Sequence, residues 1–188
     1  MTIPQGPNQR WSLDFVSDAL ADGRRFRIRC VIDDFSRECL ATVVDTSISG
    51  IRVARELDRI AEMRGYPSMV VSDNHRPAGD LQSRSAERGH GADQQRHAQV
   101  AGGAPGRMAL HRAGQTIQNG FVESFNGRLR DECLNKHLSP TLRHAHHLIA
   151  AWRDDYNHHR PHSSLDGLTP REYHQTLEED QTLNRANL

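Results

Sequence analysis

Apolar and polar residues alternate with the period of a β-strand in three stretches near the N-terminus. These stretches are residues 11–19, 25–32 and 38–45, and neighbouring side chains in each of them point to opposite faces of a sheet. Short polar links join them, the second being residues 33–37. Three strands with links this short predict an antiparallel meander.

The pattern then changes to the period of a helix. In residues 51–64 apolar side chains recur every three or four positions, with Ser49 placed to cap the first turn and Gly65 to end the helix. Residues 68–73 follow as a short apolar run that ends in Asp73, which is typical of a buried strand that carries a carboxylate to a sheet edge. Three antiparallel strands, a helix and a further strand predict a mixed α/β sheet.

Residues 75–116 have too few apolar side chains for either period. Only four of these 42 residues are large and apolar, whereas seven are glycine and eight are alanine. We expect this segment to be irregular, with no core strand and no amphipathic helix.

Helical patterns return after residue 117. One apolar face is formed by Val122, Phe125, Leu129 and Cys133. The flank beside it, at about 100° per residue, holds Asn119, Glu123, Asn126 and Arg130. Residues 141–157 predict a second amphipathic helix, and the tail, with its prolines and glycine, predicts a surface segment before a short terminal helix.

Composition limits the partners and the compartment. The 188 residues carry 24 basic and 24 acidic side chains, so contact with nucleic acid needs a local basic patch rather than an overall charge. The three cysteines are widely spaced, and no stretch is long and apolar enough to cross a membrane. We therefore expect a reduced, cytoplasmic protein with one domain and no membrane partner.

Three acids stand apart from the general surface charge: Asp14 in the first strand, Asp73 at the end of the fourth, and Glu123 on the later helix. A carboxylate in a half-buried strand is costly unless it is paired or bound to a cation. If the two strands are neighbours and the helix crosses their ends, the three carboxylates converge on a site that suits Mg²⁺ or Mn²⁺. The alternative from spacing alone is that each acid is a solvated or capping residue.

Five short sequences resemble a known family. They are WSLDFV at 11–16, VIDDFSR at 31–37, VSDN at 71–74, QNGFVESFNGRLRDECLN at 118–135 and YNHHRPHSSL at 156–165. In this order they resemble the catalytic domain of insertion-sequence transposases in the retroviral-integrase superfamily. The resemblance covers residues 7–74 and 117–173, and the fourth and fifth sequences are its most specific parts.

The resemblance implies a fold and a metal site. The fold is α/β, a ribonuclease-H-like mixed sheet with flanking helices, interrupted here by the irregular segment 75–116. An Asp-Asp-Glu triad, which falls on Asp14, Asp73 and Glu123, is implied to be catalytic and to bind two Mg²⁺ or Mn²⁺ ions. Asp33 and Asp34 lie in the family's hairpin turn, and the resemblance gives them no metal.

The resemblance also implies a DNA-binding surface. The residues implied to contact DNA are Asn119, Asn126, Arg128, Arg130, Arg160 and His162. For the two helix arginines the alternative is ordinary surface charge. For Arg160 and His162 it is attachment of the tail to the active-site end of the domain.

Residues 75–116 also depart from the family. His75 stands where the family has a glycine, and the family's Pro-Gly-Lys-Pro before the glutamate is absent. When residues 107–116 are written in GC-rich codons and read one nucleotide later, they give Ala-Trp-His-Tyr-Ile-Ala-Pro-Gly-Lys, which is similar to the family's peptide. Our hypothesis is that this segment is out of frame, through two compensating slips or a sequencing error, with both neighbouring acids still in frame.

Together these inferences predict a polynucleotidyl transferase, a transposase that joins transposon ends to target DNA and acts as a homo-multimer. A separate helix-turn-helix polypeptide or region is expected to recognise the terminal repeats, since nothing before Trp11 predicts one. The expected organisation is an N-terminal lead at 1–10, the core at 11–173 and a tail at 174–188. The alternative function is a degenerate, non-catalytic remnant that retains at most DNA or partner binding.

Overall fold

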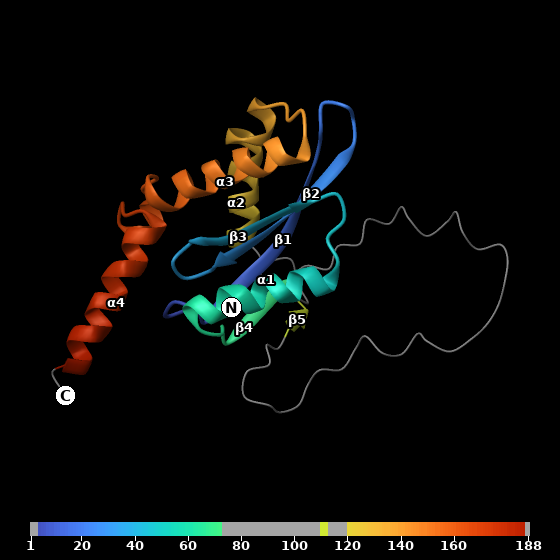
Figure 1. The fold of residues 1–188 in the computed structure, drawn as a ribbon. Helices are drawn as coiled ribbons and strands as arrows, with labels where there is room; N and C mark the ends of the chain where they lie inside the picture. The colour runs from blue at the N-terminus through green and yellow to red at the C-terminus, as the bar shows by residue number, and fades with distance from the viewer. Residues whose placement is uncertain (1–3, 73–109, 113–119, 187–188) are drawn as a thin grey trace, which may run out of the picture.

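The structure, a computed structural model, describes residues 4–72, 110–112 and 120–186 (Figure 1). Its centre is a five-stranded sheet with the order β3-β2-β1-β4-β5. The strands are β1 (Arg10–Ala19), β2 (Arg25–Asp33), β3 (Cys39–Asp45), β4 (Met69–Ser72) and β5 (Leu110–Arg112). The first three pair antiparallel, and β4 runs parallel to β1, so the predicted meander and the predicted mixed sheet are both confirmed.

Helices flank this sheet. They are α1 (Gly50–Arg64), α2 (Gly120–Glu132), α3 (Leu142–His158) and α4 (Pro170–Ala186), with the short 3₁₀ helices η1 (Leu134–Lys136) and η2 (Ser163–Leu165). The predicted ends of α1 are confirmed, because the Ser49 side chain accepts a hydrogen bond from the Arg52 N–H and Gly65 follows the last turn. No helix in the described ranges is long and apolar enough to span a membrane.

Alternation along β1 divides the core between the two faces of the sheet. Trp11 and Leu13 pack on one face with Leu57 and Ile60 of α1. Val16 belongs to the larger cluster on the other face, which α2 and α3 cover.

The apolar face predicted for α2 forms the centre of that larger cluster. All four of its predicted residues, Val122, Phe125, Leu129 and Cys133, are buried. The Phe125 ring lies 5.3 Å from the ring of Trp152 and 4.9 Å from that of Tyr156, both on α3. This packing fixes which flanks of α2 lie beside the sheet.

A side chain of α3 pairs with the first residue of the edge strand β3. The Asn157 amide oxygen accepts a hydrogen bond from the Cys39 N–H at 2.9 Å, and its amide nitrogen donates to the Cys39 carbonyl at 3.0 Å. Asn157 is buried. It therefore satisfies both backbone groups of Cys39, as a neighbouring strand would do.

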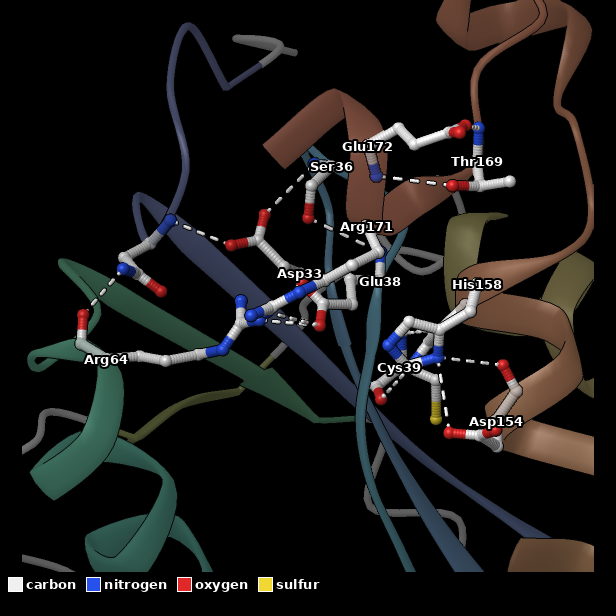
Figure 2. A network of polar contacts seen from close by, with 12 residues as sticks. Asp33, Ser36, Glu38, Cys39, Arg64, Asp154, His158, Thr169, Arg171 and Glu172 are labelled. Atoms are coloured by element: carbon white, nitrogen blue, oxygen red, sulfur yellow. Dashed lines mark hydrogen bonds and ion pairs between the residues drawn. The ribbon is translucent and has the colours of Figure 1, made fainter. Parts of the chain in front are cut away.

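A buried ionic network joins the β2–β3 turn to two helices (Figure 2). Arg64, at the end of α1, donates to both carboxylate oxygens of Glu38 at 2.5 Å, and Arg171 of α4 reaches Glu38 Oε1 at 3.4 Å. Glu38 is only 6% exposed. The network therefore attaches the start of α4 to the same carboxylate that holds α1.

One short strand was not predicted, and the prediction for the last helix is wrong. Residues 110–112 form β5, an edge strand parallel to β4, whereas the segment 75–116 was expected only to lack a core strand and an amphipathic helix. A three-residue edge strand is held by backbone pairing, which requires few apolar side chains. The terminal helix is also not short: α4 has 17 residues and starts at Pro170, a residue suited to a first turn.

Two of the predicted domain boundaries fall inside elements of the structure. The boundaries after residues 10 and 173 fall within β1 and α4. The rest of the 75–116 segment, together with Asp73 and Asn119, lies outside the described residues.

Candidate active site

Asp14 lies near the middle of β1, half-buried, on the face that α2 covers. The parallel register places Leu13 beside Ser72, the last residue of β4. Asp14 is the next residue on β1, just as Asp73 is the next residue in the sequence after Ser72. The prediction that the strands of these two acids are neighbours is confirmed for β1 and β4, while the position of Asp73 stays a prediction.

Helix α2 reaches Asp14 through Asn126. The Asn126 Nδ2 donates to Asp14 Oδ2 at 2.8 Å. Glu123 precedes Asn126 by three positions, so the two side chains share one flank of the helix. Glu123 is exposed, in the first turn of α2. The hydrogen bond therefore brings the flank that carries Glu123 to the part of β1 beside the end of β4.

The chemistry of these donors fits a magnesium or manganese ion. Asp14 and Glu123 offer carboxylate oxygens, and hard divalent ions prefer oxygen ligands. Asn126 is 8% exposed, and its Oδ1 is buried without a hydrogen-bond partner among the described residues. The Asn126 amide nitrogen holds the Asp14 carboxylate inside the protein, and the predicted DNA contact of Asn126 stays a prediction.

The opposite face of the sheet carries a cation that sequence reasoning missed. Arg29 of β2 pairs in register with Phe15, and its guanidinium carbon lies 3.7 Å from the centre of the Phe15 ring. Its Nη1 lies 3.4 Å from Ser72 Oγ. Burial lowers the pKa of Arg29 to about 10, and the charge of Asp14 opposes that shift. The sequence gives no signal that Arg29 is half-buried beside Phe15 and Ser72, because a polar residue in an alternating strand is expected to face solvent.

The two arginines predicted to contact DNA from α2 lie on different flanks of the helix. Two positions along a helix correspond to about 200° of rotation. Arg130 comes seven positions after Glu123 and shares its flank, whereas Arg128 points to the other side and contacts His162. Both arginines are exposed. The two arginines therefore do not share one flank of α2, and a DNA contact by either of them stays a prediction.

His162 is buried where the tail returns to α2 and α3. Its ring packs edge-on against Tyr156 at 4.9 Å, and its Nδ1 lies 3.5 Å from Arg128 Nη1. Burial and, next, the charge of Arg128 lower the pKa of His162 to about 4.

Arg160 is bound to the helices on either side of it. It forms ion pairs with Glu132 of α2 and with Asp155 of α3, the latter at 2.6 Å from Nε to Oδ2. Its guanidinium carbon also lies 5.2 Å from the centre of the Trp152 ring. These contacts support the structural alternative for Arg160, which is attachment of the tail, and a DNA contact stays a prediction.

The two acids of the β2–β3 turn are fully buried and serve the fold. Asp33 accepts a hydrogen bond from the backbone N–H of Asn8 at 2.8 Å, and Asp34 accepts one from Ser12 Oγ at 2.7 Å and pairs with Arg10. Burial raises the pKa of both carboxyl groups, and these hydrogen bonds oppose the shift. Sequence reasoning assigned them no metal but did not find this structural role.

The sheet order, the aspartate on its central strand and the glutamate-bearing helix across it define a ribonuclease-H-like fold. The chain belongs to the integrase core domain family of insertion-element transposases. The sequence model of that family matches residues 4–99, and a second integrase core domain model matches residues 107–170.

Relatives of the chain come from bacterial insertion elements. It is 46% identical over 173 residues to a 31.7 kDa protein of insertion element IS407 from Burkholderia multivorans, over 92% of this chain and 57% of that protein. It is 42% identical over 167 residues to a 39.2 kDa protein of insertion element IS476 from Xanthomonas euvesicatoria, over 89% and 44% of the two chains. The chain thus spans about half the length of these relatives.

A solved structure shares the fold. The catalytic core domain of HTLV-2 integrase in complex with magnesium superposes with a TM-score of 0.57 and 16% identity. The superposition covers 90% of this chain and 98% of that one. The expected ribonuclease-H-like fold is therefore confirmed.

Proposed function

We propose that this chain is the catalytic part of a transposase that joins the 3′ ends of a mobile element to target DNA in a metal-dependent reaction. The observation that carries the proposal is the hydrogen bond from Asn126 to Asp14. It brings the flank of α2 that bears Glu123 against β1, where β4 ends one residue before Asp73. Membership of the integrase core family supports the class of reaction.

In this proposal Asp14, Asp73 and Glu123 are the catalytic residues and the metal ligands. Two Mg²⁺ or Mn²⁺ ions held there would supply Lewis-acid activation of the attacking hydroxyl and of the leaving oxygen. Magnesium in the HTLV-2 core supports this choice of ion. Asn126 fixes the orientation of the Asp14 carboxylate, because its amide nitrogen is bonded to one of the two carboxylate oxygens.

The chain's own residues would also position the DNA. The 3′-hydroxyl oxygen of the element forms the new bond to phosphorus, and the bond from that phosphorus to the target's 3′ oxygen breaks. The attacking hydroxyl gives its proton to water, and the leaving 3′ oxygen takes up a proton from water. Arg130, exposed on the Glu123 flank, is proposed to contact a phosphate near this reaction. Asn119, which directly precedes α2, is proposed to contact DNA beside it.

The proposed partners are DNA and further copies of the chain. The HTLV-2 core was solved in dimeric and trimeric forms. A solved intasome of simian T-cell lymphotropic virus contains a chain that superposes on this one with a TM-score of 0.62. By analogy we propose a homo-multimer assembled on element ends and target. We also propose that a separate region or polypeptide recognises the terminal repeats.

A strand-transfer assay with the full chain tests this function. Pre-cleaved ends of the element and a labelled target DNA are incubated with and without Mg²⁺, and joined products are measured. We expect products only with Mg²⁺, and none from Glu123→Gln. Asp131→Asn is the matched control, because Asp131 is an exposed acid on another side of α2 and its loss should leave activity unchanged.

The alternative function is a non-catalytic remnant, and the departure of residues 75–116 from the family pattern favours it. A remnant would bind DNA or partners without joining ends. Absence of Mg²⁺-dependent products from the unaltered chain, with DNA binding intact, would establish this alternative.

A further inference from the structure

The side chain of Arg29 crosses the central strand of the sheet. Arg29 lies on β2, and β1 separates β2 from β4. Its guanidinium carbon lies 3.7 Å from the centre of the Phe15 ring on β1, a cation–π contact, and its Nη1 lies 3.4 Å from Ser72 Oγ on β4. One side chain of β2 therefore links all three strands.

The two contacts of Arg29 fall beside the two aspartates of the proposed metal site. Phe15 directly follows Asp14, and Ser72 directly precedes Asp73. Because side chains alternate along a strand, Phe15 and the guanidinium lie on the face of the sheet that α1 covers. The Asp14 carboxylate lies on the face that α2 covers, where Asn126 of that helix binds it. Arg29 thus holds β1 and β4 from behind the candidate active site.

The contact with Ser72 lies where the pairing of β4 with β1 ends. The last pair in the parallel register is Leu13 beside Ser72, which is also the last residue of β4. Backbone pairing within the described residues therefore stops one position before Asp73. The end of a short strand is held less firmly than its middle, because it has fewer neighbouring hydrogen bonds. The Arg29 side chain supplies a further link between the strands at this point.

Folding stability alone does not account for an arginine at this position. In the parts of the chain that the structure describes, the buried Nε of Arg29 has no hydrogen-bond partner, and the guanidinium forms no ion pair with a carboxylate. Burying a guanidinium with so few partners costs free energy. A methionine would pack on the Phe15 ring without that cost. The guanidinium is therefore expected to serve the two strands that it joins.

We propose that Arg29 is a positioning residue of the candidate metal site, which fixes the spacing between the strands of Asp14 and Asp73 so that both carboxylates reach the same ions. This inference rests on the proposed function, because that function assigns the ions to these acids. Metal ligands must be placed to within a fraction of an ångström, and groups that hold the ligands strongly affect the metal affinity. Arg29 does not bind an ion itself, since its guanidinium repels cations.

Removal of the guanidinium has opposite effects in the positioning and charge explanations. Arg29→Met keeps an apolar side chain beside the Phe15 ring and loses both the positive charge and the contact with Ser72. A positioning role predicts weaker binding of Mn²⁺, by about tenfold. An effect of charge alone predicts tighter binding, because a cation near the aspartates has been removed. A role in folding alone predicts a lower melting temperature with an unchanged affinity for Mn²⁺.

Mn²⁺ binding to the full chain is measured by electron paramagnetic resonance of the free ion during titration with MnCl₂. The variant Asp14→Asn shows which part of the binding belongs to the candidate site. Arg27→Met is the matched control, because Arg27 is exposed and lies on the same strand and the same face, two positions before Arg29. The affinity of this control should not fall. Melting temperatures of all variants are recorded without metal.

Two further variants separate the contact from the charge. Ser72→Ala removes the hydroxyl that Arg29 contacts and keeps the guanidinium, so it should weaken Mn²⁺ binding, though less than Arg29→Met does. Arg29→Lys keeps the positive charge but loses the planar group that spans β1, so it should bind Mn²⁺ at least as weakly as Arg29→Met. If Arg29→Met does not fold, Ser72→Ala decides, and an unchanged affinity in Ser72→Ala then overturns the proposal.

The outcomes distinguish this inference from the proposed function. If Arg29→Met binds Mn²⁺ as tightly as Arg27→Met or more tightly, the positioning role is overturned, while the proposed strand transfer is unaffected. Mn²⁺ binding that Asp14→Asn abolishes and Arg29→Met weakens supports the positioning role, even if the unaltered chain joins no DNA ends and the proposed function is wrong. If the unaltered chain binds no Mn²⁺, both the metal site and the role of Arg29 are overturned.

Discussion

At the scale of single residues, the amide of Asn126 links the helix of Glu123 to the strand of Asp14. We expect Asn126→Ala to lower Mg²⁺-dependent strand transfer by about 10–100-fold, because the Asp14 carboxylate loses the group that orients it. The free energy of unfolding should fall by only about 1 kcal/mol. Asn135→Ala, at an exposed position in η1, is the control and should change neither quantity. Equal activity of the two variants would contradict the orienting role.

The buried histidine predicts a particular dependence of stability on pH. The folded-state pKa of His162 is about 4, below the ordinary value of 6.5, so the unfolded chain binds more protons between those values. Stability from this residue is therefore complete above about pH 6.5. It falls as the pH is lowered toward 4, by roughly 2 kcal/mol at pH 5.

His162→Asn removes this titration and isolates it from other groups. The groups facing the ring are Arg128, Arg37, Arg160 and Tyr156, and only the histidine titrates in this window. We expect the unfolding free energies of the two proteins, measured by urea at pH 7.5 and pH 5, to converge as the pH falls. A difference that is independent of pH would show that His162 is not held neutral.

Sequence reasoning found the residues of the candidate site more readily than their partners. The helical period correctly placed Glu123, Asn126 and Arg130 on one flank, since that depends only on spacing. It could not show that Asn126 bonds to Asp14, which is 112 positions away. The same limit applies to Arg29, whose burial depends on Phe15 across the strand pair.

At the scale of elements, the carboxylate of Glu38 joins α1 to the β2–β3 turn and to α4 (Figure 2). Arg64→Met should lower the free energy of unfolding by about 3–5 kcal/mol, because it leaves a buried carboxylate without its two-point partner. Adding Glu38→Gln should recover part of that loss, since the charge is removed as well. Chemical denaturation of the single and the double variant measures both changes in the free energy of unfolding.

An exposed pair on the same helix provides the control for Arg64. Arg59 and Glu56 are one turn apart on α1 and lie at the surface. Arg59→Met should cost less than about 1 kcal/mol. If the two arginine variants lose the same stability, the buried position of Glu38 does not matter to the fold.

Elements with a strong internal period could be predicted, and those held by distant partners could not. The first three strands, α1, β4, α2 and α3 all match the patterns of apolar residues within about two positions. Strand β5 could not be predicted because three residues carry no period and depend on pairing with β4. The start of α4 did carry a local signal that was missed, because Thr169 and Glu172 form a reciprocal capping pair three positions apart.

At the scale of the whole molecule, the hypothesis of a shifted reading frame concerns the segment between two proposed metal ligands. Restoring the one-nucleotide-shifted reading of residues 75–116 should raise both the melting temperature and strand-transfer activity. A restored core strand buries apolar surface, at about 25 cal/mol per Å², and pairs the backbone groups of its neighbour. Against a net stability of about 5–15 kcal/mol this gain is large.

Glu123→Gln in the restored protein separates chemistry from folding. The substitution should abolish activity. The melting temperature, measured in the absence of metal, should be nearly unchanged because Glu123 is exposed. If the restored chain is no more stable than this one, the segment is a genuine insertion. The nucleotide sequence gives an independent test, since no other frame across these codons would then encode the family's peptide.

The pairing of Asn157 with Cys39 has a consequence for the chain during its synthesis. The two residues are 118 positions apart, so the backbone of Cys39 at the edge of β3 lacks this partner until most of the protein has left the ribosome. An open strand edge on a nascent chain can pair with other nascent chains. Contacts between such distant residues also form slowly, because a long loop must close first. The N-terminal strands of this protein are therefore expected to need protection by chaperones until α3 emerges.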